Sequence, residues 1–338
     1  MGLNEKFFKT SAVDDTPNFA PILYTGNGGT NVITGVGFAP DFVWIKGRTI
    51  NVDHAAFDTV RGATKYISPS TFGAEGTYST VLNAFGSDGF TVGSNSGVNS
   101  SSSTYVAWCW KAGGAAVSNT DGTTTSQVSA NTNAGFSIVS YYGNSASGPT
   151  VGHGLSSKPE LILFKNISVG NDWAVYSSPV TANYYMMLNK TNAKIDYQHM
   201  FNDTEPDSSV FTLGYQGKVN QSGNQYIAYA FHSVAGYQKI GSYTGAASSG
   251  LTVTTGFRPK WVMIKRTDSA NDWVIIDSIR DTSDPYSKIL WADLPDAEAD
   301  GGSTTALSFS DTGFSMSTSA VGGSINASGG TYIYLAIA

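Results

Sequence analysis

One motif of a glycine, a proline, an apolar run and a lysine occurs three times in this chain of 338 residues, at 37–46, 154–165 and 256–265. In each copy the proline lies six residues before the lysine, and an aspartate lies seven residues after it. The three sets are Pro40, Lys46 and Asp53; Pro159, Lys165 and Asp172; and Pro259, Lys265 and Asp272. Such regular spacing predicts one folding unit in three copies, each about the size of a small domain.

Two further apolar runs recur in each copy. One closes the unit, at 104–110, 225–231 and 331–337, and another precedes it, at 87–93, 208–214 and 310–316. Apolar residues alternate in these runs with a period of two, and clusters of Gly, Asn and Ser separate them, as is typical of antiparallel sandwiches. We therefore predict an all-β fold of three tandem antiparallel β-sandwich domains, jelly-roll-like in form, with Trp44, Trp108, Trp261 and Tyr332 in the core.

The repeats and the composition between them suggest domain boundaries. We predict an N-terminal docking arm at 1–18, sandwich repeats at 19–111, 136–236 and 237–338, and a Gly/Ser/Thr-rich linker at 112–135. The linker is poor in apolar residues, which favours a flexible or extended connector. The arm carries Phe7 and Phe8, which are candidate docking residues; a frayed terminus is the alternative interpretation.

Composition and charge exclude several classes of partner. The net charge is −6 and the 19 Lys and Arg residues are scattered, which argues against nucleic acid, because neutralising phosphates needs clustered cations. No apolar run is long enough to span a membrane, so we expect no membrane insertion. The single cysteine, Cys109, lies between two tryptophans and is interpreted as a buried residue rather than a reactive thiol.

The polar residues do not form a recognisable catalytic or metal-binding pattern. The four histidines, His54, His153, His199 and His232, lack metal-ligand spacing, and His54 aligns with Trp173 and Trp273, which favours ring packing. We predict no catalytic residues, no metal and no cofactor, and therefore no enzyme. A catalytic site assembled between the units from the three repeated aspartates is the alternative.

Asp58 and Arg61 recur as Asp277 and Arg280, three residues apart, whereas the second unit lacks both charges. This recurrence predicts a structural ion pair that holds a turn. The repeated aspartates Asp53, Asp172 and Asp272 are interpreted as turn caps.

Four tyrosines lie outside the apolar runs and are candidates for a surface contact, because a tyrosine ring offers an apolar face and a polar tip. They are Tyr66, Tyr78, Tyr184 and Tyr185.

Several segments resemble a repeat family that is common in tailed bacteriophages of marine and cyanobacterial hosts. The segments are 1–12, 34–46, 57–66, 88–93 and 104–113. Members of that family are virion structural proteins, usually tail fibres, and the first unit is the most similar to them. The resemblance implies a non-enzymatic tail fibre or spike component that contacts the host surface.

The resemblance also implies partners and a location. We expect other virion proteins, a homotrimer by the usual symmetry of such appendages, and a host-surface glycan as partners, in a virion assembled in the host cytoplasm. A capsid decoration or head-fibre protein is one alternative. A host-glycan-binding or glycan-degrading appendage is the second.

Overall fold

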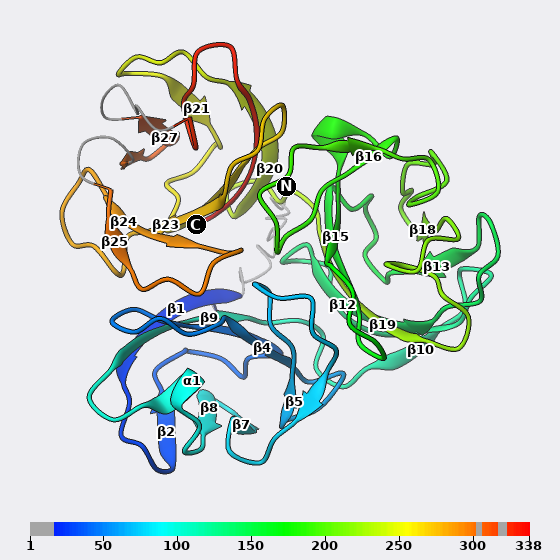
Figure 1. The fold of residues 1–338 in the computed structure, drawn as a ribbon, viewed down its shortest axis with the longest axis horizontal. Helices are drawn as coiled ribbons and strands as arrows, with labels where there is room; N and C mark the ends of the chain where they lie inside the picture. Colours follow the sequence, from blue (N-terminus) through cyan, green and yellow to red (C-terminus); the bar gives the residue numbers. More distant parts are fainter. Residues whose placement is uncertain (1–16, 302–305, 317–322) are drawn as a thin grey trace, which may run out of the picture.

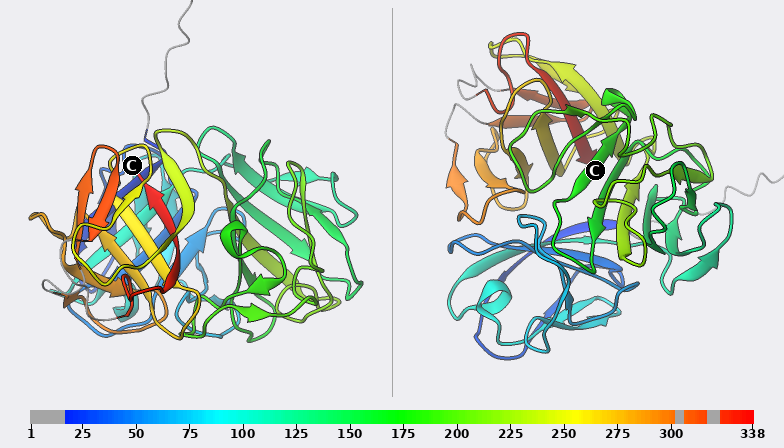
Figure 2. Two further views of the ribbon diagram at one scale, coloured as in Figure 1. Left: turned by 90° about the horizontal axis from the view of Figure 1, so that it is seen from above. Right: turned by 45° about the vertical axis from the view of Figure 1, so that its right-hand side comes forward.

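The computed structural model describes residues 17–301, 306–316 and 323–338. These residues form antiparallel sheets with one short α-helix and one short 3-10 helix, so the predicted all-β class is confirmed. Figure 1 shows three lobes side by side around a common centre, one for each copy of the repeat, and Figure 2 shows the same body from two other sides.

The first unit has one large and one small sheet. The large sheet has the strand order β1-β9-β3-β4, the small sheet β2-β8-β7, and β5 pairs with β6. Its elements are β1 (Phe19–Thr25), β2 (Asn31–Thr34), β3 (Phe42–Gly47), β4 (Ala55–Asp58), β5 (Lys65–Tyr66), β6 (Gly76–Thr77), β7 (Leu82–Gly86), β8 (Gly89–Val92), α1 (Ser96–Asn99) and β9 (Thr104–Trp110).

The second unit has a six-stranded sheet of order β10-β11-β12-β19-β14-β15 and the smaller pairs β13-β18 and β16-β17. Its elements are β10 (Val117–Asn119), β11 (Ser126–Asn131), β12 (Phe136–Tyr142), β13 (Thr150–Gly152), β14 (Leu161–Asn166), β15 (Ala174–Ser177), η1 (Ser178–Val180), β16 (Tyr184–Tyr185), β17 (Ile195–Asp196), β18 (Val210–Thr212) and β19 (Gln225–Phe231).

The third unit has a six-stranded sheet of order β20-β28-β22-β23-β24-β25 and a three-stranded sheet of order β21-β27-β26. Its elements are β20 (Gln238–Thr244), β21 (Thr252–Thr254), β22 (Trp261–Arg266), β23 (Trp273–Asp277), β24 (Lys288–Trp291), β25 (Ala299–Asp300), β26 (Leu307–Ser310), β27 (Gly313–Met316) and β28 (Thr331–Ile337).

The repeated motif occupies the same place in each large sheet. The closing strand (β9, β19 or β28) lies between an opening strand (β1, β12 or β20) and the lysine-bearing strand (β3, β14 or β22). The strand that carries the next part of the repeat (β4, β15 or β23) pairs with the other edge of the lysine strand. The three units therefore share one topology in their large sheets.

Both faces of each large sheet are buried. In β9, Tyr105, Ala107 and Cys109 face the sandwich core of the first unit, whereas Val106, Trp108 and Trp110 face a second core. That second core also contains Tyr229 and Phe231 of β19 and Leu335 and Ile337 of β28, so all three units share it. A strand buried on both faces is apolar at nearly every position, because each alternate row of side chains meets another layer.

The predicted core residues Trp44, Trp108, Trp261 and Tyr332 are all buried, and so is Cys109. The division into three domains stays a prediction, since the sheets also pack against one another through the shared core.

The predicted linker at 112–135 needs a correction. It contains β10 and β11, and β11 adds to the large sheet of the second unit by pairing with β12. Val128 packs in the core of that unit, and Ser126 and Ser129 are buried with their hydroxyls donating to Gly152 O and Gly114 O. The low apolar content was misleading, because buried serines can satisfy their hydroxyls on backbone carbonyls.

Two glycines allow close contacts between strands of the small sheets. An ideal Cβ on Gly89 would lie 1.9 Å from Ile33 O, and one on Gly313 would lie 2.0 Å from Val253 O. Only glycine allows β8 and β27 to approach the neighbouring strand this closely.

The three repeated lysines join the units into a closed ring. Each lies at the end of its strand, on the face toward the shared core, and is fully buried. Each ammonium group donates to a backbone carbonyl of the neighbouring unit: Lys46 to Pro295 O at 3.1 Å, Lys165 to Phe72 O at 3.0 Å and Lys265 to Thr191 O at 2.8 Å. The first unit thus donates to the third, the second to the first and the third to the second.

A second set of contacts follows the same cyclic order. The rings eight residues after the lysines donate to the neighbouring unit: His54 Nε2 to Trp291 O at 2.8 Å, Trp173 Nε1 to Ser68 O at 2.8 Å and Trp273 Nε1 to Met187 O at 2.9 Å. Backbone bonds return in the opposite sense: Glu75 N to Ile167 O, Lys194 N to Thr267 O and Glu298 N to Arg48 O. Each junction is therefore bonded from both sides.

Replacing Trp173 by Phe tests one junction. The substitution removes the donor to Ser68 O and shortens a buried ring, so we expect the free energy of unfolding to fall by about 2 kcal/mol. Urea denaturation of Trp173→Phe measures this change. The matched control is Trp291→Phe, whose ring is half-buried, and for which we expect a loss below about 1 kcal/mol. A Trp173→Phe variant as stable as the control would contradict the role of this ring.

Candidate functional sites in the hollow, the junctions and the surface tyrosines

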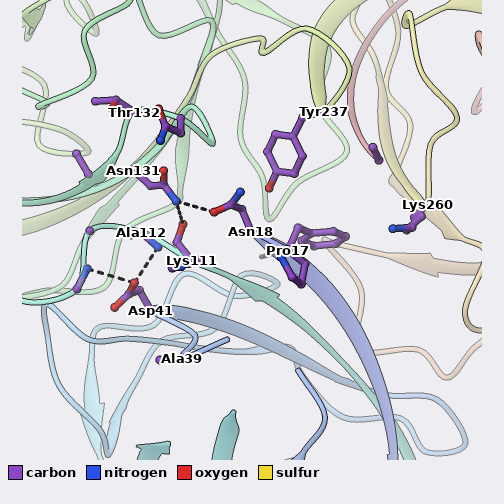
Figure 3. A pocket seen from close by; sticks show the side chains of 16 residues that line it. Pro17, Asn18, Ala39, Asp41, Lys111, Ala112, Asn131, Thr132, Tyr237 and Lys260 are labelled. Carbon is purple, nitrogen blue, oxygen red and sulfur yellow. Dashed lines mark hydrogen bonds between the residues drawn. The ribbon is translucent and has the colours of Figure 1, made fainter. Parts of the chain in front are cut away.

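A hollow of about 950 Å³ lies where the three units meet, at the end of the shared core opposite the lysine ring. Figure 3 shows its lining, with Asn18 and Lys111 from the first unit, Asn131 at the end of β11, and Tyr237 and Lys260 from the third unit. The Asn131 side chain ties two units together by donating to Asn18 Oδ1 at 2.9 Å and to Lys111 O at 3.2 Å.

The carboxylate in this hollow, Asp41, is committed to structure. It is buried and accepts bonds from Ala112 N at 2.8 Å, Gly114 N at 3.3 Å and the Thr59 hydroxyl at 3.1 Å. Both oxygens of this carboxylate are therefore already bonded within the fold. What remains toward the opening is mainly neutral amides, a tyrosine ring and two lysines, which suits contact better than acid–base chemistry.

The predicted ion pairs are present and each is bonded across a junction. Arg61 binds Asp58 at 2.5 Å and Arg280 binds Asp277 at 2.7 Å, all four side chains being nearly inaccessible. The neighbouring closing strand supplies a further donor: Tyr229 Oη binds Asp58 at 2.7 Å, and Trp108 Nε1 binds Asp277 at 3.0 Å.

The second unit, which lacks these charges, has lost both sides of the contact. Ser177 stands in place of the aspartate, and its buried hydroxyl has no partner. In the third unit, Leu335 occupies the position that Tyr229 and Trp108 occupy in the other units, so the third unit directs no side-chain donor at Ser177. Donor and acceptor have changed together, as expected for a structural contact.

His54 substitutes for the tryptophan of the other two junctions. Its Nδ1 accepts from the Trp44 indole at 2.7 Å, so its Nε2 carries the proton that is donated to Trp291 O. Burial, and then the charge of Lys46, lower its pKa well below the usual value, which keeps the ring neutral. In the part of the chain that the structure describes, no cluster of three His, Cys, Asp or Glu side chains could hold a metal ion.

In the first and second units, the repeated aspartate accepts a hydrogen bond from a side chain in a following loop, rather than capping its own turn. Ser70 Oγ donates to Asp53 at 3.2 Å, and Asn189 Nδ2 donates to Asp172 at 2.8 Å. The same two residues accept the backbone amides of His54 and Trp173, so they link each aspartate to its junction.

In the third unit this linking residue is an acid, Asp293. Its Oδ1 accepts Trp273 N at 2.9 Å, but its buried Oδ2 has no hydrogen-bond partner. Burial, with the negative charge of Asp272 adding to it, raises the pKa of Asp293 from an ordinary 3.8 to about 7. A protonated carboxyl group is able to donate a hydrogen bond, as Ser70 and Asn189 do at this position in the other units.

The four predicted surface tyrosines have different environments. Tyr78 is 51% exposed, whereas Tyr66 is half-buried with its ring 6.0 Å from that of Tyr78. Tyr184 is half-buried under the Lys194 ammonium group, 4.6 Å from its ring centre. Tyr185 is buried in the core of the second unit, so the prediction of a surface contact by this residue is wrong; its side chain points to the core face of β16. Phe7 and Phe8 lie outside the described residues.

Sequence reasoning missed three rings next to Tyr185. Tyr197 packs edge-on against it at 6.3 Å, His199 lies 5.2 Å from Tyr197, and Tyr215 lies 4.4 Å from His199. Tyr78 and Tyr197 follow Tyr66 and Tyr185 by the same number of residues, so an alignment of the repeats offers a signal for Tyr197. His199 and Tyr215 meet only through folding.

Taken together, the geometry defines an all-β body of three like units whose repeated polar residues bond the units to one another. A family model described as a domain of unknown function, DUF7483, matches residues 14–338, so the chain belongs to this family. No curated protein matches it. Among the described residues, the helices are too short to cross a membrane.

Replacing Asp293 by Asn tests the acid at the third junction. The raised pKa means that the folded state holds a proton that the unfolded state releases, so Asp293 costs stability as the pH rises from about 4 to about 7, and the cost persists above 7. The amide introduced by the substitution cannot ionise, so Asp293→Asn should stabilise the protein at pH 8 more than at pH 4.5, as measured by urea denaturation.

The converse variant, Asn189→Asp, is the matched control for this prediction. It places an acid at the equivalent position of the second unit and should lose more stability at pH 8 than at pH 4.5. A pH-independent difference between Asp293→Asn and the unsubstituted protein would contradict the assignment.

Proposed function

We propose that the protein is a non-enzymatic structural component of a bacteriophage particle, a tail fibre or spike component that contacts the host surface. The observation that carries the proposal is the use of the repeated polar residues: the lysines, the junction rings and the Asp–Arg pairs all bind within the fold. Because these buried polar groups bond the three units to one another, they favour a rigid body, as a structural component requires. The resemblance of the first unit to phage virion proteins supports the same role.

The positions of the chain ends in the described structure suggest an orientation. Pro17 and Ala338 both line the hollow, and the lysine ring lies at the other end of the shared core. A body attached through residues 1–18 would turn the hollow toward the particle and the lysine-ring face away from it. Other virion proteins are then the partners at the hollow.

We also propose that the protein forms a homotrimer, because such appendages usually have threefold symmetry. A molecular mass from light scattering of three times the chain mass would support the homotrimer, and a mass equal to that of one chain would contradict it.

A capsid decoration or head-fibre protein is the second candidate, because a compact body with an attachment point at one end suits a head lattice as well as a tail. A glycan-degrading appendage is the third. It would need two carboxylates placed on facing walls of a cleft. The carboxylate of the hollow, Asp41, is bonded within the fold, which favours the structural role.

Gold-labelled antibody against the purified chain should mark the tails of phage particles from the source culture in electron micrographs. Labelling confined to heads would support the decoration protein instead. Particles that carry no label, with the chain present in the same lysate, would contradict a virion role of either kind.

Deleting residues 1–16, which leaves the Asn18 contact with Asn131 in place, should abolish incorporation of the protein into particles while leaving its circular dichroism spectrum unchanged. Incorporation at the level of the full chain would contradict the docking arm.

The non-enzymatic part of the proposal has its own test. Incubation of the protein with host polysaccharide should release no reducing sugar, and release that scales with protein concentration would overturn this part of the proposal.

A further inference from the structure

The second unit carries a row of aromatic rings that runs from its core to its surface. The row begins at buried Tyr185, continues through half-buried Tyr197 and His199, and ends at Tyr215, which is 47% exposed. His199 and Tyr215 lie 4.4 Å apart between ring centres with 34° between their planes. The outer end of the row is an aromatic surface fixed at its inner end by the core.

Two loops hold this row in place by backbone hydrogen bonds. Gly214 N donates to Met200 O at 2.9 Å, and Gln216 N donates to His199 O at 3.2 Å. An ideal Cβ on Gly214 would lie 1.9 Å from His199 O, so glycine is needed for the loops to meet this closely. The rings are therefore positioned before any ligand arrives, which reduces the entropy lost on binding.

Two of the polar side chains next to the rings are neutral amides. Gln216 Nε2 donates to Tyr197 Oη at 3.2 Å, and Gln198 is exposed beside the rings. The two lysines nearest to the row in sequence are directed elsewhere: Lys218 binds Asn171 and Asp172, and Lys194 lies over the Tyr184 ring. An aromatic face with an amide and hydroxyl rim matches a pyranose, which presents an apolar C–H face and a hydroxyl edge. A protein hot spot would instead be expected in a larger apolar patch.

The other two units supply an internal comparison. The first unit repeats only the inner pair: Tyr66 and Tyr78 pack edge-on as Tyr185 and Tyr197 do, and Tyr78 N and Tyr197 N make equivalent backbone bonds. Thr80 and Ser94 stand in place of His199 and Tyr215, because Gly93 meets Thr80 as Gly214 meets His199. The third unit has Ile289 and Gly301 in place of the inner pair. Among the residues that the structure describes, the full row is therefore found in the second unit, although the fold does not require it.

We propose that His199 and Tyr215, supported by Tyr197, form a binding site for neutral polysaccharide, with a pyranose ring stacked on the Tyr215 and His199 rings. This inference goes beyond the proposed function, because binding by the isolated protein does not depend on membership of a particle.

The test is binding of the full chain to immobilised neutral oligosaccharides of glucose, galactose and mannose, compared with Tyr215→Ala and His199→Ala. Tyr215→Ala should weaken binding about tenfold, which corresponds to about 1.4 kcal/mol, because it removes one stacked ring. Tyr215→Phe should bind like the unsubstituted protein, because it retains the ring. The matched control is Tyr142→Ala, which removes a tyrosine that is 60% exposed on the same unit and lies outside the row.

Three outcomes would overturn the inference: no binding to any neutral oligosaccharide, equal binding by Tyr215→Ala and Tyr142→Ala, or binding only to anionic glycans or to protein. Unchanged circular dichroism of the variants excludes misfolding as the cause of a loss. Failure here with gold label still present on particles would remove the glycan site and leave the virion role intact. Glycan binding by the protein, with no gold label on particles, would support the glycan site and remove the virion role.

Discussion

Three buried ammonium groups constrain the whole architecture. Burial lowers the pKa of each lysine, Lys46, Lys165 and Lys265, to about 8, so each requires polar partners in the protein to remain charged at neutral pH. Those partners are carbonyls of the lysine's own unit and of the next unit. No unit can satisfy its lysine alone. The same contact, made three times in cyclic order, closes the units around one core.

Because the junctions repeat, their differences show which groups depend on one another. The aspartate of the first and third units accepts a hydrogen bond from a side chain on the neighbouring closing strand. In the second unit Ser177 replaces the aspartate, and Leu335, which has no donor, replaces the side chain that faces it. A histidine replaces one junction tryptophan and keeps the donated bond to the neighbouring carbonyl. The histidine keeps this carbonyl satisfied, whereas the second unit has lost the charged acceptor together with its donor, which leaves a neutral hydroxyl unpaired rather than a charge. By comparison, the aromatic rings near the surface differ between the units without paired changes.

The sequence contained enough to predict the all-β class, the repeat and the burial of Trp44, Trp108 and Trp261, because period-two apolar runs report local structure directly. It did not reveal the shared core, although β9 is apolar at nearly every position, since the pattern does not say what covers the second face. The prediction of the linker was wrong because Ser126 and Ser129 are buried and donate to backbone carbonyls that only the folded chain brings next to them. The Tyr215 and His199 contact joins loops that only the fold brings together.

The most direct test of the shared core is scanning calorimetry of the intact chain, with the calorimetric enthalpy compared with the van't Hoff enthalpy. Units bonded in a ring around one core should unfold together, which predicts a single transition and a ratio of the two enthalpies of about one. Three separate transitions, or a single one with a ratio of about three, would show that the units unfold independently and would contradict the account.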